Sequence, residues 1–210
     1  MRILVLNGSP RPNGNTAAMA AAFTAGAIAA GHRVDVINIC RKNIHGCLGC
    51  EFCHTKGNGN CIQNDDMQEI YPLLEQAEML VLASPIYYHG FSGQLQCALN
   101  RIYALDKPQK LKRAALFLSS GDRDVYDGAI YVYRNSFLDY LKLENMGIFT
   151  AYGDQNKSEE LLNRLSAFGR SLIDIHEGGY SMGGHIAALS DSVTRKKVVY
   201  KNRYGMDIMG

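Results

Sequence analysis

Short apolar runs rich in β-branched residues recur along most of the chain, and longer helix-favouring stretches separate them. The apolar runs predict buried strands over residues 3–6, 34–39, 79–83, 114–118 and 148–151. The stretches between them have the composition and length of helices and cover residues 16–30, 65–76, 92–105, 129–143 and 157–175. Five successive strand–helix units predict an α/β fold built on a parallel sheet.

The connections between these units limit the topology. Right-handed crossovers between parallel strands place helices on both faces of the sheet. We therefore expect a three-layer sandwich whose five-stranded sheet has the order 2-1-3-4-5. In a sheet of this order the ligand binds at the carboxyl ends of the strands, beside the first strand, where the order reverses.

The segment from Asn7 to Thr16 follows the first predicted strand and reads Asn-Gly-Ser-Pro-Arg-Pro-Asn-Gly-Asn-Thr. A loop of this kind leads into a helix whose first N–H groups lack internal acceptors and lie at the positive end of the helix dipole, so it favours an anion. Gly8 and Gly14 permit tight turns. The side chains that can bind a phosphate here are those of Ser9, Arg11, Asn13, Asn15 and Thr16.

Spacing excludes several other phosphate loops. The chain has no Gly-Lys-Ser/Thr element of a nucleoside triphosphate loop, and the Gly-x-Gly-x-x-Gly pattern is missing after the first strand. No Cys stands six residues before an Arg, as a cysteine phosphatase loop requires. A site for a terminal phosphate monoester remains, with an ordinary strand-to-helix turn as the alternative.

Two further segments are expected at the same edge of the sheet. Residues 84–90 follow the third strand and read Ser-Pro-Ile-Tyr-Tyr-His-Gly, and Ser-Ser-Gly-Asp follows the fourth. Backbone groups and aromatic rings at these positions suit the edge and face of a planar heterocycle. The candidate residues are Pro85, Ile86, Tyr87, Tyr88, Ser119, Ser120 and Gly121.

A cysteine-rich insertion of residues 40–64 separates the second strand from its helix, and a loop of this length is usually functional. Cys47, Cys50 and Cys53 have Cys-x-x-Cys-x-x-Cys spacing, and Cys61 follows. Four thiols of this kind match the ligand count of a 4Fe–4S cluster. A zinc site or a disulfide, and a structural loop without metal, are the other two interpretations. Cys40, expected in a strand, and Cys97, expected in a helix, are assigned to packing.

Together these motifs resemble those of one family. Gly-Ser-Pro-Arg-x-x-Gly-Asn-Thr after the first strand is similar to the phosphate loop of the flavodoxin-like NADPH-dependent FMN reductases and iron–sulfur flavoproteins. Residues 47–67, 84–101 and 119–122 are similar to the same group. The resemblance covers about the first 175 residues, and the combination is more specific than any one motif.

This resemblance implies a flavodoxin-like fold, bound FMN and NAD(P)H as co-substrate. The implied activity is electron transfer from NAD(P)H through FMN to a quinone, a flavin or another small acceptor, without a catalytic acid or base. The alternative is an electron carrier with a 4Fe–4S cluster at the cysteine loop and a ferredoxin-type partner. Family members without a cluster also keep the cysteine run, so the resemblance leaves the metal open.

Composition adds limits to these expectations. The chain has 210 residues, with 22 basic and 20 acidic side chains and no long run of either sign, so neither a nucleic-acid nor a membrane partner is expected. No apolar stretch approaches the length of a membrane span. We expect a cytoplasmic protein with reduced thiols.

Two parts of the chain differ in character. Residues 1–176 are expected to form the FMN-binding domain. Residues 177–210 open with a glycine-rich break and carry a modest basic cluster, and they read as a solvated extension or as an arm that embraces a second subunit. A homodimer or homotetramer is the expected assembly.

Overall fold

The computed structural model describes residues 1–173, 200–201 and 207–208. The chain divides into two compact units, Met1–Asp174 and Ile175–Gly210. In the second unit, β6 (Tyr200–Lys201) pairs antiparallel with β7 (Asp207–Ile208). The predicted end of the last helix at residue 175 and most of the proposed arm, including its basic residues 195–197 and 203, lie outside the described residues.

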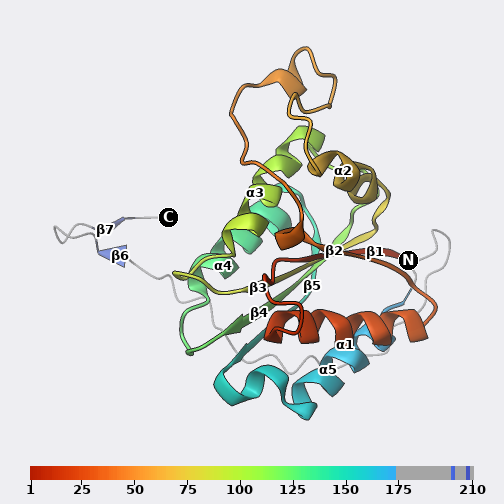
Figure 1. Ribbon diagram of the computed structural model, residues 1–210, viewed down its shortest axis with the longest axis vertical. Coiled ribbons are helices and arrows are strands. Elements are labelled where there is room, and N and C mark those ends of the chain that lie inside the picture. The colour runs from red at the N-terminus through yellow and green to blue at the C-terminus, as the bar shows by residue number, and fades with distance from the viewer. Residues whose placement is uncertain (174–199, 202–206, 209–210) are drawn as a thin grey trace. The chain divides into compact units, whose positions relative to one another are not determined.

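The first unit is built on a five-stranded parallel sheet (Figure 1). Its strands are β1 (Arg2–Asn7), β2 (Arg33–Asn38), β3 (Met79–Pro85), β4 (Arg113–Ser120) and β5 (Glu144–Tyr152). Their order is β2-β1-β3-β4-β5, which confirms the predicted flavodoxin-like topology. The reversal of strand order therefore lies beside β1.

Helices cover both faces of this sheet (Figure 1). α1 (Asn15–Ala29) and α5 (Glu159–Ser171) lie side by side on one face. The opposite face carries α2 (Met67–Gln76), α3 (Gly93–Arg101) and α4 (Asp127–Val132), and α4 continues as a π-helix over Tyr133–Tyr140. The three predicted layers are thus present.

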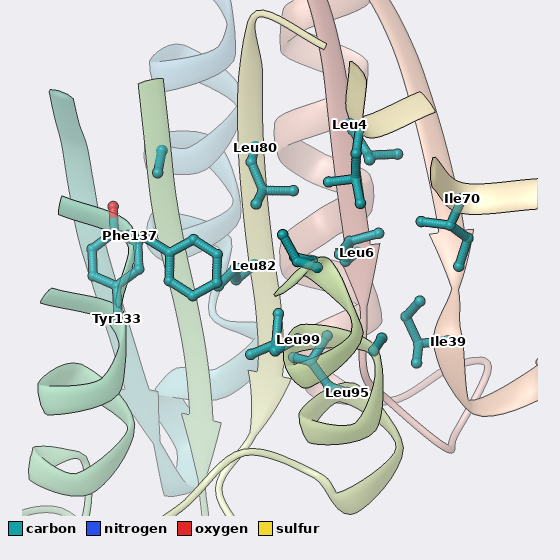
Figure 2. Close-up of a cluster of buried hydrophobic side chains, with 14 of the residues drawn as sticks. Leu4, Leu6, Ile39, Ile70, Leu80, Leu82, Leu95, Leu99, Tyr133 and Phe137 are labelled. Atoms are coloured by element: carbon teal, nitrogen blue, oxygen red, sulfur yellow. The ribbon is translucent and has the colours of Figure 1, made fainter. Parts of the chain in front are cut away.

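Alternating side chains of the strands build two separate cores, because successive residues of a strand point to opposite faces. Leu4 and Leu6 of β1 join the core beneath α2, α3 and α4, where Leu80, Leu82 and Phe137 also pack (Figure 2). Ile3 and Val5 join the core beneath α1 and α5. Both faces of β1 are buried, which explains its unbroken apolar run.

Two glycines set the close approach of α1 to α5. A Cβ atom at Gly26 would lie 2.0 Å from the carbonyl oxygen of Ser166, and one at Gly169 would lie 2.4 Å from that of Phe23. The rings of Phe23 and Phe168 pack nearby with centroids 5.4 Å apart. Small residues on both helices therefore allow their backbones to touch.

Several predicted element boundaries were wrong. Pro85 and Ser119, predicted to lie in loops, are paired residues of β3 and β4, so the strands reach further toward the site. Cys40, predicted to lie in a strand, sits in a 3₁₀ turn over Ile39–Arg41. The last helix begins at Glu159, not at 157, because the Ser158 hydroxyl accepts the N–H of Leu161 at 3.2 Å.

Candidate functional site

The loop between β1 and α1 is folded by its own short contacts. The Ser9 hydroxyl donates to the carbonyl of Arg11 at 3.0 Å, and the N–H of Gly14 donates to the same carbonyl at 3.0 Å. Where the loop leaves β1, a Cβ atom at Gly8 would lie 2.7 Å from Ser92 Oγ and 2.9 Å from Leu95 Cβ. Only glycine fits between β1 and α3 at this point.

The N-terminus of α1 presents unused donors. Gly14 is the N-cap residue and no side chain caps the helix. The first intrahelical bond runs from the N–H of Ala18 to the carbonyl of Gly14 at 3.0 Å, so the N–H groups of residues 15–17 precede it. Within the described residues the exposed guanidinium of Arg11 has no ion pair or hydrogen bond. Free N–H groups at a helix start and a nearby cation are the chemistry that suits an anion.

The hydroxyl of Thr16, a predicted phosphate ligand, lies against the end of β4. Thr16 Oγ1 and Ser119 Oγ lie 2.6 Å apart, and both side chains are buried. Thr16 was predicted to bind phosphate and Ser119 to bind a ring, yet the two hydroxyls bond to each other. This contact joins the start of α1 to the end of β4 and leaves the backbone N–H of Thr16 at the anion site.

The turn after β3 has an unusual backbone. The N–H of Ile86 donates to the carbonyl of Ser119 at 2.8 Å, and Tyr87 and Gly90 exchange two backbone bonds of 3.0 Å. Between them Tyr88 and His89 adopt left-handed conformations, with φ values of 48° and 63°. Two such residues in succession without glycine indicate a strained turn, a feature that clusters at functional sites.

A hollow of about 390 Å³ separates this turn from the end of β4. It is lined by Ile86, Tyr88, His89, Ser120, Gly121, Asp122 and Val125. Four of the predicted ring-binding residues therefore face one space, whereas Tyr87 does not line it. The Ser120 hydroxyl lies 2.7 Å from that of Tyr126, and Tyr126 donates to the carbonyl of Ala151 at 2.9 Å, which fixes this wall. Burial raises the pKa of Tyr126, so its hydroxyl stays protonated.

A larger hollow of about 460 Å³ lies elsewhere, along α1 and β2. It reaches the loop at Asn7 and Ser9, is lined by four alanines of α1 and does not include the turn after β3. Its other polar residues are Thr24, Asn38 and Arg41. The smaller hollow lies between the ends of β3 and β4, at the carboxyl edge of the sheet, and is the better place for a planar ligand.

The cysteine loop projects beyond α2 and α3 (Figure 1), and backbone-to-carboxylate bonds close its base. The N–H of Asn43 donates to Asp66 Oδ2 at 2.8 Å, and the N–H of His45 donates to Asp65 Oδ2 at 3.0 Å. The second helix was predicted to begin at residue 65, but α2 starts only at Met67, whose N–H donates to the Asp65 carboxylate at 3.1 Å.

Arg101 of α3 completes this base. Its guanidinium binds Asp65 through two bonds of 2.7 and 3.2 Å and donates to the carbonyl of His45 at 3.0 Å. The side chains are 1% and 4% exposed. Burial alone would raise the pKa of Asp65, but the hydrogen bonds from Arg101, His45 and Met67 outweigh it, so the pKa is lowered. No sequence motif had indicated a role for Arg101.

The four cysteines of the loop differ in their surroundings. Cys47 and Cys50 are exposed, whereas Cys53 and Cys61 are partly buried against the core beneath α2 and α3. Within residues 1–173, no three Cys, His, Asp or Glu side chains converge as metal ligands do. All described cysteines are free thiols, so no disulfide joins them. The structure thus positions the loop but does not gather its thiols.

Two residues at the site were not predicted from the sequence. They follow β5 and are far in the chain from the segments that they contact. Lys157 donates from Nζ to the carbonyl of Asn13 at 2.6 Å, and Asn156 donates from Nδ2 to the carbonyl of Ser120 at 2.8 Å. The predicted strand order alone offered a signal for them, since the end of β5 lies at the same edge of the sheet.

A parallel sheet of this order, with the uncapped start of α1 beside the point where the order reverses, defines a flavodoxin-like α/β protein. Residues 1–155 match the family described as NADPH-dependent FMN reductase. The chain belongs to this family, and its class is therefore that of an oxidoreductase. In the part of the chain that the structure describes, no helix has the length and apolar character to span a membrane.

Curated relatives carry the name iron-sulfur flavoprotein. One from Archaeoglobus fulgidus is 29% identical over 189 residues, which cover 87% of this chain and 83% of that protein. Another from Methanocaldococcus jannaschii is 33% identical over 101 residues, about half of each chain at 48% and 51%.

Solved structures with the same fold include an NAD(P)H:quinone oxidoreductase from Methanothermobacter marburgensis, with a TM-score of 0.67 and 18% identity. The match covers 85% of this chain and 99% of that one. An FMN-dependent NADH-azoreductase from Bacillus anthracis in complex with FMN has a TM-score of 0.57 and 15% identity over 81% and 96% of the two chains. At these identities the likeness shows the fold alone.

Proposed function

We propose that the protein uses bound FMN to pass electrons from NAD(P)H to a small acceptor such as a quinone or a flavin. One observation carries this proposal: the uncapped start of α1, with the unpaired Arg11 beside it, opens at the same edge of the sheet as the hollow between the ends of β3 and β4. A phosphate at the first site and a planar ring at the second match the two ends of FMN. Family membership supports the same cofactor.

The residues divide between these two ends. Arg11 supplies a charged fork of donors to the phosphate, and the N–H groups of residues 15–17 supply the helix dipole. The other predicted phosphate residues are Ser9, Asn13, Asn15 and Thr16. Thr16 offers its N–H, and its hydroxyl can donate to the phosphate while it accepts from Ser119.

At the ring, Ile86 and Tyr88 supply apolar and aromatic contacts from one side, and Ser120 and Gly121 supply polar groups from the other. Pro85 and Ser119 position these walls through strand pairing, and Tyr87 does so through its two bonds to Gly90. When bound, FMN supplies hydride acceptance and electron transfer. The protein orients the ring and offers N–H groups where negative charge develops.

The test is FMN binding to the purified protein, compared with riboflavin binding. Arg11→Ala removes a charge-assisted contact worth about 1.5 to 3 kcal/mol, so FMN affinity should fall about tenfold to a hundredfold while riboflavin affinity stays unchanged. Arg134→Ala is the matched control, because Arg134 is exposed and lies on α4's π-helical continuation. Equal FMN affinity in the wild type and the Arg11 variant would remove this loop from the site.

A second function is an electron carrier with a 4Fe–4S cluster at Cys47, Cys50, Cys53 and Cys61 and a ferredoxin-type partner. It is favoured by the donor set of four thiols, by the fixed base of their loop and by the name of the relatives. Cys47 and Cys50 would have to approach Cys53 and Cys61. Anaerobic isolation with iron and sulfide analysis tests it, and about four irons per chain are expected. Absence of iron after anaerobic isolation and reconstitution would count against the cluster.

We also propose that residues 1–176 form the FMN-binding domain and that residues 177–210 form an extension of it. A homodimer or homotetramer, with the extension as a dimer arm, is the assembly it implies. Light scattering of the full chain and of a chain ending at residue 176 tests both points. A full chain that stays monomeric at high concentration would contradict the arm.

A further inference from the structure

The hollow between the ends of β3 and β4 is lined by a histidine that the proposed function does not use. Neither ring nitrogen of His89 has a hydrogen bond or an ion pair within the described residues. By contrast, His32 and His54 each bond a backbone carbonyl, at 3.0 and 2.9 Å. His45 lies 3.5 Å from the carboxylate of Asp65. Among the histidines that the structure describes, His89 is therefore the one whose ring is free to meet a ligand.

The backbone places His89 in a turn that does not favour this residue. Tyr87 and Gly90 pair as an antiparallel bridge. Between them Tyr88 and His89 have positive φ values, the pattern of a type I′ turn, in which Asn and Gly predominate. A Cβ atom at Gly128 of α4 would lie 2.5 Å from the carbonyl oxygen of His89, so this helix packs directly on the turn. A histidine in such a strained and fixed position indicates a function for its side chain.

The residues around the hollow form a floor and a rim. The half-buried ones, which make the floor, are Ile86, Ser120 and Val125. The exposed ones, which make the rim, are Tyr88, His89, Gly121 and Asp122. A carboxylate can only accept a hydrogen bond, and a phenol is a much weaker acid than an imidazolium. Imidazole is thus the group of this rim that is suited to give a proton near neutral pH.

We propose that His89 is a catalytic residue that gives a proton to an oxygen of the acceptor, and that the acceptor is a quinone. A quinone becomes a hydroquinone by gaining a hydride and a proton. Both electrons come from NAD(P)H, which is oxidised to NAD(P)⁺ in the activity proposed above. As the second quinone oxygen is protonated, an N–H bond of the imidazolium breaks and an O–H bond forms, which leaves a neutral imidazole. Water returns the proton to the exposed ring.

This inference rests on the proposed function and names its acceptor class. A one-electron acceptor such as ferricyanide takes up no proton, so it has no need of His89. A quinone needs the proton, so the two acceptors should respond differently to loss of the imidazole. Duroquinone is the suitable quinone, because its fully substituted ring does not add to cysteine thiols.

Two variants remove the imidazole without disturbing the turn. Asn and Gly both tolerate the left-handed backbone, so His89→Asn and His89→Gly should fold. His54→Asn is the matched control, since His54 is exposed and does not line this hollow. Thermal unfolding of each variant confirms that it is folded.

The FMN bound to each protein is reduced anaerobically with NAD(P)H and then reoxidised by either acceptor in a stopped-flow instrument. In both His89 variants, reduction by NAD(P)H and reoxidation by ferricyanide should stay within about threefold of the wild type, whereas reoxidation by duroquinone should be about a hundredfold slower. The His54 control should match the wild type with both acceptors.

A second measurement does not depend on turnover. Durohydroquinone, the reaction product, can donate an O–H to the neutral ring of His89. In the FMN-loaded, oxidised protein labelled with ¹⁵N-histidine, its addition should shift the NMR signals of the His89 ring, which are assigned by their loss in His89→Asn. The variant should bind durohydroquinone about tenfold more weakly.

The outcomes distinguish this inference from the proposed function. If His89→Asn is reoxidised by duroquinone as fast as the wild type, or if its reoxidation by both acceptors slows equally, the inference is overturned and the proposed function stands. His89 ring signals that do not move with durohydroquinone also overturn the inference. A wild type that binds no FMN overturns the proposed function, and this inference with it.

Discussion

Asp65→Asn tests the buried ion pair that closes the base of the cysteine loop. The carboxylate of Asp65 accepts two bonds from Arg101, one from the N–H of His45 and one from the N–H of Met67. An amide at this position offers one acceptor oxygen and no charge. The guanidinium of Arg101, 1% exposed, then stays buried without a counter-charge.

The magnitude follows from this burial. Removing one partner of a buried pair costs about 3 to 5 kcal/mol, and the bonds that an amide keeps place Asp65→Asn at the lower end, about 3 kcal/mol. Domains of this kind are stable by about 5 to 15 kcal/mol, so the loss is large. Arg101→Leu leaves the two backbone donors on Asp65, and the double variant should recover part of the loss because neither charge remains buried alone.

Urea unfolding followed by circular dichroism gives the free energy of unfolding, and limited proteolysis reports whether the loop of residues 46–64 is released. Asp139→Asn is the matched control, since Asp139 is exposed. Coincident unfolding curves for the wild type and Asp65→Asn would refute the reasoning. They would mean that an amide at residue 65 stabilises the protein as well as the ion pair of Asp65 with Arg101 does.

Three further predictions concern stability. The folded pKa of Asp65 is lowered, so its contribution to stability is present above its ordinary pKa of about 4 and is lost as the pH falls through the folded value. Asp65→Asn should therefore flatten the decline in unfolding free energy below about pH 4, and an unchanged decline would contradict this. Gly26→Ala should lower the unfolding free energy, measured in urea, by about 1 to 3 kcal/mol, because the added Cβ would meet the carbonyl oxygen of Ser166. A variant at least as stable as the wild type would show that α1 and α5 can move apart without loss. His89→Gly should raise the midpoint of thermal unfolding, since it relieves about 1 kcal/mol of backbone strain beside Tyr88, whereas a lower midpoint would show that the His89 side chain stabilises the turn.

The sheet, its strand order and the loop beside the point where that order reverses could all be predicted from the amino-acid sequence. Strands such as β1 are buried on both faces and therefore read as continuous apolar runs, and the helices between them allow few topologies. The loop of residues 7–16 is contiguous, so its glycines, its donors and Arg11 are all visible in one stretch. Element ends were less certain, because Pro85 and Ser119 extend their strands only by pairing with each other.

Contacts between segments that are distant in the chain became visible only in the folded protein. The bond between Thr16 and Ser119 and the approach of Lys157 to Asn13 join residues more than a hundred positions apart. Arg101 gained its role because α3 packs where the base of the cysteine loop returns to α2. The spacing of the cysteines identified four candidate thiols, but it did not predict where their side chains point. Each side-chain rotamer depends on the surface against which it packs. A motif of neighbouring residues can be recognised in the sequence. The partner of each buried polar group depends on which helices and strands the sheet brings together.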